Sequence, residues 1–352
     1  MAVDVSVTAG KTAPASPGKA EALATAAVEA ARRLLGVEAV PESPPPMPQP
    51  YKRRHMNSIR LRCGAATFIA TRRRDAKFAK HETDVLFAFG ARRAPAPRVL
   101  AAEGEWLIQE DVGEKRLIEP LQSMAAAEGI ALLERAAAAL WRCQDAVAGE
   151  KFVAEAQEFG GGDRLIAGPG RLGEVLQAPA PPLADEKILS LIRPPEAVFV
   201  KWDARPANAI LNSSGAVYWI DWEEWGRRCR LDDLVWLVCD EWVPDFGPAE
   251  DEFIARQIRG RKAPFADGVR GAETYVAAFG ALHCLLRLDI ILRAKGREAW
   301  WSKENCLAYD LIGVTRECAL RLLARAQRLA AKVDVMAPLA EWTAALPGRL
   351  PP

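Results

Sequence analysis

The chain has 352 residues, of which 50% are hydrophobic and 26% are charged, a composition typical of soluble globular proteins with a sizeable core. Its formal net charge of +1 gives no overall field that would attract nucleic acid or an anionic membrane. There is no uninterrupted apolar run of the roughly 18 residues that a membrane helix needs, and residues 1–30 lack the pattern of a secretory signal. We therefore expect a cytoplasmic protein with one large domain or two smaller ones.

The cysteines and histidines do not indicate a zinc site or a disulfide framework. The seven cysteines are scattered, odd in number and without a CxxC pair, so we expect reduced and mostly buried thiols. The three histidines lie far apart and show no ligand spacing. Each is expected to be a surface residue or a satisfied core residue.

The first 50 residues differ in composition from the rest of the chain. Residues 1 to about 20 are rich in Ala, Pro, Ser and Gly and are predicted to be disordered. Residues 19–36 predict an amphipathic helix that ends at a glycine, and residues 40–50 predict a Pro-rich tether. Residues 1–50 are therefore expected to form an N-terminal arm.

Residues 51–113 are predicted to form a small β-rich unit with one helix. Residues 58–64 and 66–74 are strand-like runs around a glycine. Residues 76–91 carry apolar side chains at helical spacing. Residues 94–113 then predict two further strands joined by a turn.

Residues 114–352 are predicted to be mainly helical. A long helix rich in Ala and Leu is expected at 120–147, and the clearest later helices are expected at 274–294 and 307–333. Between them, residues 198–226 predict strand, loop and strand. The sequence thus predicts an α+β protein with a small β-rich unit followed by a larger helical one.

Three oxygen-bearing side chains lie at the edges of these last strand-like segments. Asp203 and Asn208 follow the run at 197–200, and Asp221 follows the run at 216–220. A Ser-Ser-Gly turn separates the neighbouring strands, so the three side chains are expected to converge beside a short sheet. Each alone could be a turn or cap residue, but all three at this spacing favour a shared site.

This set of side chains suits phosphoryl transfer from Mg-ATP. Mg²⁺ prefers hard oxygen ligands and usually shares them with substrate phosphates. A further carboxylate would orient the attacking hydroxyl and accept its proton, and positioning with charge neutralisation supplies most of the rest.

The stretch resembles the catalytic-loop motif of the aminoglycoside phosphotransferase and choline kinase families, which have a protein-kinase-like fold. Their pattern is roughly His-Gly-Asp-x-x-x-x-Asn, then a strand, then Ile-Asp-Trp/Phe-Glu. The resemblance implies that Asp203 is the catalytic Asp, Asn208 a metal ligand and Asp221 the principal metal ligand. It also implies that Asp233 caps the following helix and braces the catalytic loop.

The resemblance extends upstream to the β-rich unit. It places Arg72 where a Lys contacts the ATP phosphates, and Glu82 where a Glu pairs with that Lys. Arg72 could instead belong to a solvated basic run, and Glu82 could be a surface helix residue. The family's architecture implies two lobes, a small β-rich N-lobe at 51–113 and a larger mainly helical C-lobe at 114–352, with ATP between them. The hinge beside the adenine would then be Gln109, Glu110, Asp111 and Val112.

The chain departs from the family pattern near the expected catalytic residue. Lys201 replaces the His, Trp202 replaces the Gly, and the strand Lys is Arg72, with no Gly-rich phosphate loop before it. An Arg supplies positive charge, but its planar fork is not a point charge. Either Arg205 or Lys201 is expected to supply a charge facing the γ-phosphate, although Lys201 could equally point to solvent at a strand end.

The acceptor stays open among an aminoglycoside, a choline-like amine, a sugar and an amino alcohol. Several tryptophans together with nearby acids could form an acidic, aromatic-edged pocket for a cationic acceptor. The acids of this possible pocket are Asp232, Asp240, Glu241 and Asp245.

The alternative to a small-molecule kinase is a catalytically impaired kinase-like protein that acts by nucleotide or protein binding. The departures from the family pattern favour that alternative, and the retained Asp203/Asn208/Asp221 set opposes it.

Overall fold

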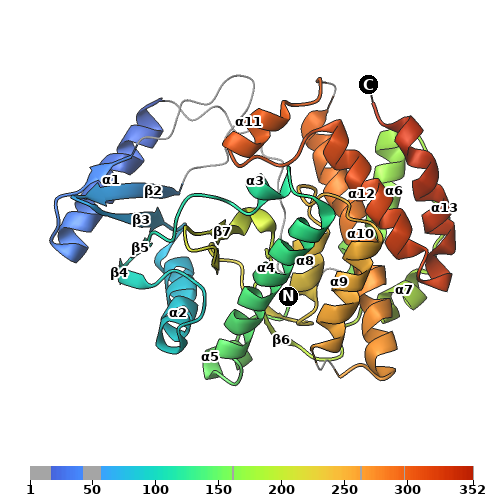
Figure 1. Cartoon of the computed structure of the whole chain (residues 1–352), viewed down its shortest axis with the longest axis horizontal. Coiled ribbons are helices and arrows are strands. Elements are labelled where there is room, and N and C mark those ends of the chain that lie inside the picture. The colour runs from blue at the N-terminus through green and yellow to red at the C-terminus, as the bar shows by residue number, and fades with distance from the viewer. Residues whose placement is uncertain (1–16, 43–56, 161, 262–263, 297, 352) are drawn as a thin grey trace. The chain divides into compact units, whose positions relative to one another are not determined.

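A computed structural model describes residues 17–42, 57–160, 162–261, 264–296 and 298–351 (Figure 1). These residues form two compact units. The first unit comprises the described residues of Met1–Ala79 and Leu100–Asp111, and the second comprises those of Lys80–Val99 and Val112–Pro352.

The first unit is built around a five-stranded sheet with the strand order β1-β2-β3-β5-β4. β2 pairs antiparallel with β1 and with β3, and β3 pairs antiparallel with β5. The turn between β4 and β5 uses Gly104 at φ +58°, a left-handed conformation that glycine adopts at little cost. The strands are β1 (Val40–Pro41), β2 (Ser58–Cys63), β3 (Ala66–Arg72), β4 (Val99–Glu103) and β5 (Trp106–Glu110).

Helix α1 (Pro17–Leu35) packs on this sheet, and Figure 1 shows it beside β2 and β3. Its small residues Ala27 and Ala31 allow the helix to approach the sheet closely, and they share a buried cluster with Ile59 and Leu61. The predicted helix is confirmed. The prediction of disorder is wrong for residues 17–20, which belong to α1, and its remaining part lies outside the described residues.

The predicted Pro-rich tether begins as an edge strand. Val40 and Pro41 pair with Arg62 and Leu61 of β2. Proline is tolerated in an edge strand because its missing N–H is not needed by a further neighbour. The rest of the tether, from residue 43 to residue 50, lies outside the described residues.

Most of the second unit is helical, and α10 (Gly268–Lys295) packs against both α6 (Gly162–Leu176) and α12 (Arg316–Ala330). α10 is long and apolar enough to cross a membrane, but 89% of its most apolar window is buried inside the protein, as in the core helix of a soluble protein. The remaining α-helices are α2 (Ala76–Arg92), which begins in the first unit, α3 (Ile118–Leu121), α4 (Ala126–Ala146), α5 (Lys151–Ala154), α7 (Asp185–Leu191), α8 (Asp232–Val238), α9 (Pro248–Arg259), α11 (Lys303–Ala308) and α13 (Ala337–Ala345).

Two predicted long helices are each interrupted. The one expected at 120–147 is divided into α3 and α4, and the carboxylate of Glu128 accepts the N–H of Ala125 where α4 begins. The one expected at 307–333 is divided into α11 and α12. Asp310 adopts a left-handed φ of +52°, and the Thr315 hydroxyl accepts the N–H of Cys318 to start α12. The second interruption brings a loop to the candidate site.

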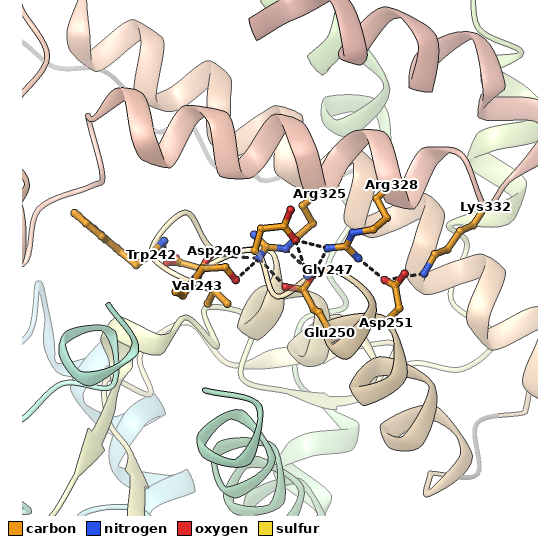
Figure 2. A network of polar contacts seen from close by, with 11 residues as sticks. Asp240, Trp242, Val243, Gly247, Glu250, Asp251, Arg325, Arg328 and Lys332 are labelled. Atoms are coloured by element: carbon orange, nitrogen blue, oxygen red, sulfur yellow. Dashed lines mark hydrogen bonds and ion pairs between the residues drawn. The ribbon is translucent and has the colours of Figure 1, made fainter. Parts of the chain in front are cut away.

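A buried ionic network joins α9 to α12 (Figure 2). Arg325 and Glu250 are both fully buried and form two hydrogen bonds of 2.7 Å. Arg325 also donates to the carbonyl of Pro244 at 3.0 Å, and Arg328 pairs with Glu250 at 2.9 Å. Such a pair fixes the orientation of the two helices, because removing either partner would leave a charge buried without its counterion.

Candidate functional site

The predicted catalytic segment folds as two short strand pairs around a loop. β6 (Val198–Val200) pairs antiparallel with β9 (Gly226–Arg228), a strand that the sequence analysis missed. β7 (Ala209–Leu211) pairs antiparallel with β8 (Val217–Trp219) in the predicted hairpin. Asn212 organises the turn of this hairpin by accepting two backbone N–H groups through its Oδ1.

The structure brings Asp203, Asn208 and Asp221 close together. The N–H of Ile220 donates to the carbonyl of Asn208 at 2.9 Å, which extends the hairpin up to Asp221. The side-chain nitrogen of Asn208 donates to the Asp203 carboxylate at 2.7 Å and to the Asp203 carbonyl at 3.1 Å. Because the amide nitrogen faces Asp203, the amide oxygen faces away and is the atom suited to a cation.

Lys201 lies inside the protein and not at its surface. Its side chain is fully buried, and its ammonium donates to the Asp221 carbonyl at 2.6 Å and to the Asp203 carbonyl at 3.3 Å. The ammonium also lies 5.2 Å from the ring centroid of Trp222, within cation–π range. The alternative in which Lys201 points to solvent is therefore wrong, and one cation links the backbones of Asp203 and Asp221.

Asp233 holds the other side of the catalytic loop. Its carboxylate accepts the N–H groups of Lys201 at 2.8 Å and Trp202 at 2.9 Å, and the side chain of Gln144 donates to it at 2.9 Å. Burial raises the pKa of Asp233 to about 6, against the lowering effect of these donors. The expected bracing contact is present, but Asp233 lies within α8, whose N-terminus has no side-chain cap, so the capping role is wrong.

Trp202 occupies the position that the family pattern assigns to glycine. Its φ of +70° lies in the left-handed region, which glycine adopts more readily than other residues. The indole stacks on Phe159 with ring centroids 4.6 Å apart and also contacts Trp236. The backbone N–H groups of Lys201 and Trp202, which donate to the Asp233 carboxylate, and this aromatic packing together hold Trp202 in this conformation. The conformation is unfavourable for a residue with a Cβ.

Arg205 pairs with a buried acid next to the loop. Its Nε donates to the fully buried Asp240 at 2.9 Å. Burial by itself would lower the pKa of Arg205, but the charges of Asp240 and Asp203 raise it. Arg205 therefore remains a cation within electrostatic reach of Asp203, anchored by Asp240.

The four acids that the sequence suggested as a cationic pocket all have arginine partners. Three of them are fully buried, and burial in ion pairs leaves them no open face for a cationic acceptor, so this predicted pocket is wrong. The pairs are Asp232–Arg228 at 2.8 Å, Asp240–Arg205 at 2.9 Å, Glu241–Arg287 at 2.5 Å and Asp245–Arg328 at 2.7 Å.

Arg116 and Asp310 lie beside the catalytic loop, and the sequence analysis did not identify them. Arg116 donates to the carbonyl of Ala207 and pairs with Asp310 at 3.1 Å. The Asp310 side chain is 40% exposed. Although this side chain is partly exposed, desolvation by the surrounding residues raises the pKa of Asp310; the charges of Arg116 and Arg205 oppose this rise, and those of Asp221 and Asp203 add to it. A third carboxylate thus faces the same region as the two predicted ones.

The α2 residues of the second unit are fixed to the segment that follows Asp221. Glu82 is fully buried, and its Oε1 accepts the N–H of Trp222 at 3.1 Å. His81 stacks on Trp225 with ring centroids 4.0 Å apart, and the Trp225 indole donates to the His81 carbonyl at 3.0 Å. Glu82 is therefore not a surface helix residue.

In the first unit, the two neighbouring arginines at the end of β3 differ in exposure. Arg72 is 52% exposed and pairs with Glu105 at 2.8 Å. Arg73 is only 6% exposed. Arg72 is the last residue of β3 and Arg73 follows it directly, so the buried arginine lies one position after the predicted one.

The predicted hinge residues lie where the chain passes from one unit into the other. Gln109 is buried near the end of β5, and Asp111 pairs with Arg60 at 2.9 Å. Val112 is the first residue of the second unit after β5. The chain thus crosses between the two units at the predicted residues, and both their role as a hinge and their contact with a nucleotide stay predictions.

Asn208 and Asp221 fit a magnesium ion that also binds phosphates. Within the described residues, no group of three or more His, Cys, Asp or Glu side chains could hold a metal by itself. Mg²⁺ needs only one or two protein carboxylate or amide oxygens when phosphates and water complete its octahedral shell. The oxygen chemistry of Asn208 and Asp221 meets this requirement.

The comparisons with known proteins bear on the fold. Models of protein families give no match, and neither do curated proteins. A crystal structure of a protein proposed to be an aminoglycoside phosphotransferase, from Ralstonia eutropha JMP134, is 15% identical, with a TM-score of 0.50 over 86% of this chain and 98% of that one. Spectinomycin phosphotransferase in complex with ADP and spectinomycin is 9% identical, with a TM-score of 0.54 over 88% of this chain and 98% of that one.

A third neighbour is a choline/ethanolamine kinase family protein from Mesorhizobium loti, which is 15% identical, with a TM-score of 0.46 over 91% of this chain and 99% of that one. The two neighbours with TM-scores of 0.50 and 0.54 are phosphotransferases by name, in agreement with the motif resemblance. The chain therefore has the α+β, protein-kinase-like fold of these phosphotransferases.

Proposed function

We propose that the chain is an ATP-dependent phosphotransferase that moves the γ-phosphoryl group to a hydroxyl of a small molecule. The observation that carries this proposal is the joint placement of Asp203, Asn208 and Asp221, with the carbonyls of both aspartates on the buried ammonium of Lys201. Neighbours of this fold act on small molecules, and one of them was crystallised with ADP and spectinomycin.

In the proposed reaction, Asp203 accepts the proton of the acceptor hydroxyl as its oxygen attacks the γ-phosphorus of ATP. A new P–O bond to the acceptor forms, the bond to the β,γ-bridging oxygen breaks, and ADP leaves with that electron pair. The amide of Asn208 holds the Asp203 carboxylate in place for this proton transfer. A positioned general base of this kind contributes roughly 10²–10⁴-fold to the rate.

Asn208 and Asp221 would hold Mg²⁺. When bound, the ion would neutralise phosphate charge and orient the phosphates for transfer. Arg205, held by Asp240 at 2.9 Å, is the cation that we assign to the γ-phosphate, since the ammonium of Lys201 is buried on two backbone carbonyls.

For nucleotide binding, we propose that Arg73 and not Arg72 supplies the phosphate-contacting cation of the first unit. Arg72 is half exposed, whereas Arg73 next to it is buried. Adenine contact is assigned to the hinge residues Gln109, Glu110, Asp111 and Val112. A cytoplasmic location, where ATP is abundant, belongs to the same proposal.

We propose no narrower class of acceptor than a small molecule with a free hydroxyl. Aminoglycosides, choline-like amines, sugars and amino alcohols all carry a suitable hydroxyl. Because the expected acidic pocket is closed by arginines, Asp310 is the partly exposed acid that we assign to acceptor contact. Likeness of fold does not make the protein an antibiotic-resistance enzyme.

The alternative, a catalytically impaired kinase-like protein, has one specific observation in its favour. Arg72, which takes the place of the phosphate-binding Lys, is engaged with Glu105 at 2.8 Å. If Arg73 does not replace it, the chain would bind nucleotide weakly or not at all.

The experiment that separates the two functions is a thermal-shift titration of the full chain with ATP, with and without Mg²⁺. The phosphotransferase predicts a stabilisation that depends on Mg²⁺ and is lost in Asp221→Ala. Absence of any shift under either condition would overturn it. ATP consumption measured against a panel of amines, sugars and aminoglycosides would then identify the acceptor.

A further inference from the structure

One peptide group beside Asp221 is held from both sides by buried side chains of opposite charge. The carbonyl of Asp221 and the N–H of Trp222 belong to the same planar group and point in opposite directions in a trans peptide. The ammonium of Lys201 donates to this carbonyl at 2.6 Å, and the carboxylate of Glu82 accepts this N–H at 3.1 Å. Both charged side chains are fully buried.

The backbone at this point adopts a conformation that needs support. Asp221 has a φ of +59°, in the left-handed region that is unfavourable for a residue with a Cβ. Such residues persist where their surroundings fix them. Rotation of the Asp221–Trp222 peptide group would break both hydrogen bonds at once, so Lys201 and Glu82 together fix the direction in which the Asp221 side chain leaves the backbone.

The same ammonium also reaches the catalytic loop. Lys201 donates to the carbonyl of Asp203 at 3.3 Å, so it ties the proposed base and the proposed metal ligand to one point. Glu82 belongs to α2, which is otherwise fixed to this segment by the stacking of His81 on Trp225 at 4.0 Å. The peptide group is therefore anchored to two different elements of the second unit.

We propose that Lys201 and Glu82 form a peptide clamp that positions Asp221 for Mg²⁺, and that neither residue touches the substrate. This inference rests on the proposed function. It explains why a lysine is accepted beside the catalytic Asp: it provides a buried donor to two carbonyls and does not contact phosphate. It also gives Glu82 a role that does not depend on pairing with an arginine.

The first test compares Lys201→Met with a matched control, Lys295→Met. Lys295 is also buried, donates to one carbonyl at 2.7 Å and lies 5.1 Å from the ring of Trp300, but it is at the end of α10. Both variants should lower the melting temperature. Only Lys201→Met should raise the Mg²⁺ concentration needed for ATP-dependent stabilisation, by about 10–100-fold, as expected for loss of a residue that orients a metal ligand.

A conservative series makes the test independent of whether Lys201→Met folds well. Lys201→His retains one ring N–H donor and should recover part of the Mg²⁺ response. Glu82→Gln retains an acceptor oxygen and should stay close to wild type, whereas Glu82→Met should behave like Lys201→Met. The double variant Lys201→Met/Glu82→Met should lose less than the sum of the single losses, because both side chains hold the same peptide group.

The outcomes distinguish the clamp from the function on which it rests. A wild-type chain without any Mg²⁺-dependent response to ATP overturns both. A responsive wild type with an unchanged Mg²⁺ requirement in Lys201→Met and Lys201→His overturns the clamp alone. An equal loss in Lys295→Met also overturns it, because the effect would then follow general destabilisation. In kinetic assays the clamp predicts a lower kcat at limiting Mg²⁺ with little change in the acceptor KM.

Discussion

The side-chain amide of Asn208 donates a hydrogen bond of 2.7 Å to the carboxylate of Asp203. In the proposed reaction the amide nitrogen of Asn208 would hold the base, while its amide oxygen, which faces away from Asp203, would be the atom for the metal. A single Asn on this short loop would thus serve both proton acceptance and phosphate binding.

Replacement of the proposed base should remove turnover and preserve binding. Asp203→Asn keeps the shape of the side chain but removes the proton acceptor, so kcat should fall by about 10²–10⁴-fold. The Mg²⁺-dependent stabilisation by ATP should remain, because Asn208 and Asp221 are intact. Steady-state ADP release with the best acceptor from screening measures the first effect, and a thermal shift measures the second. Wild-type turnover in Asp203→Asn would contradict the assignment of the base.

The two arginines at the end of β3 should differ in their effect on nucleotide binding. Arg72→Ala removes a half-exposed side chain whose pair with Glu105 is worth about 0–1 kcal/mol, so the Kd for ATP should change by less than about threefold. Arg73→Ala removes the buried cation and should weaken ATP by about tenfold or more, as expected for a charged hydrogen bond of 1.5–3 kcal/mol. Isothermal titration of ATP into both variants decides which of the two arginines contacts the phosphates. The opposite order would restore Arg72 as the phosphate contact.

The ion pair between α9 and α12 should dominate the stability of that part of the second unit (Figure 2). Glu250→Gln leaves the fully buried Arg325 without its counterion, so the free energy of unfolding should fall by about 3–5 kcal/mol. Asp84→Asn breaks an exposed pair with Lys80 on α2 and should cost no more than about 0.5 kcal/mol. Urea unfolding of the two variants measures the difference. Equal losses would show that the buried Arg325–Glu250 pair contributes no more to the free energy of unfolding than the exposed pair does.

Local patterns predicted much of the fold. Periodicity identified α2 and the strands of the first unit, and glycines marked the turns, because these features depend on neighbours along the chain. The interruptions between α3 and α4 and between α11 and α12 were missed because Ala- and Leu-rich runs favour a continuous helix on both sides of the break. Local patterns also predicted α1, but its place on the sheet depends on contacts with β2 and β3, which no local pattern contains.

The candidate site was predictable where spacing carried the signal. Asn208 and Asp221 flank one hairpin and Asp203 lies on the loop just before it, so their convergence followed from the turn. Asp310 belongs to a loop about ninety residues further along, and it was missed because it lies inside a run that was predicted to be one continuous helix. The carbonyl partners of Lys201 could not be predicted, because a lysine near a strand end is usually solvated.

His283 should make the second unit sensitive to acid. Burial, together with the positive charge of Arg287, lowers the pKa of His283 from 6.5 to about 3. Between these pH values the unfolded chain binds one more proton at this residue, so the free energy of unfolding falls as the pH falls, by about 1.4 kcal/mol per unit. His283→Phe removes this contribution. From pH 6.5 to pH 4.5 the free energy of unfolding of the variant, relative to that of the wild type, should therefore rise by roughly 2 kcal/mol. Urea unfolding at both pH values measures the gap; its independence of pH would mean that His283 titrates normally in the folded protein.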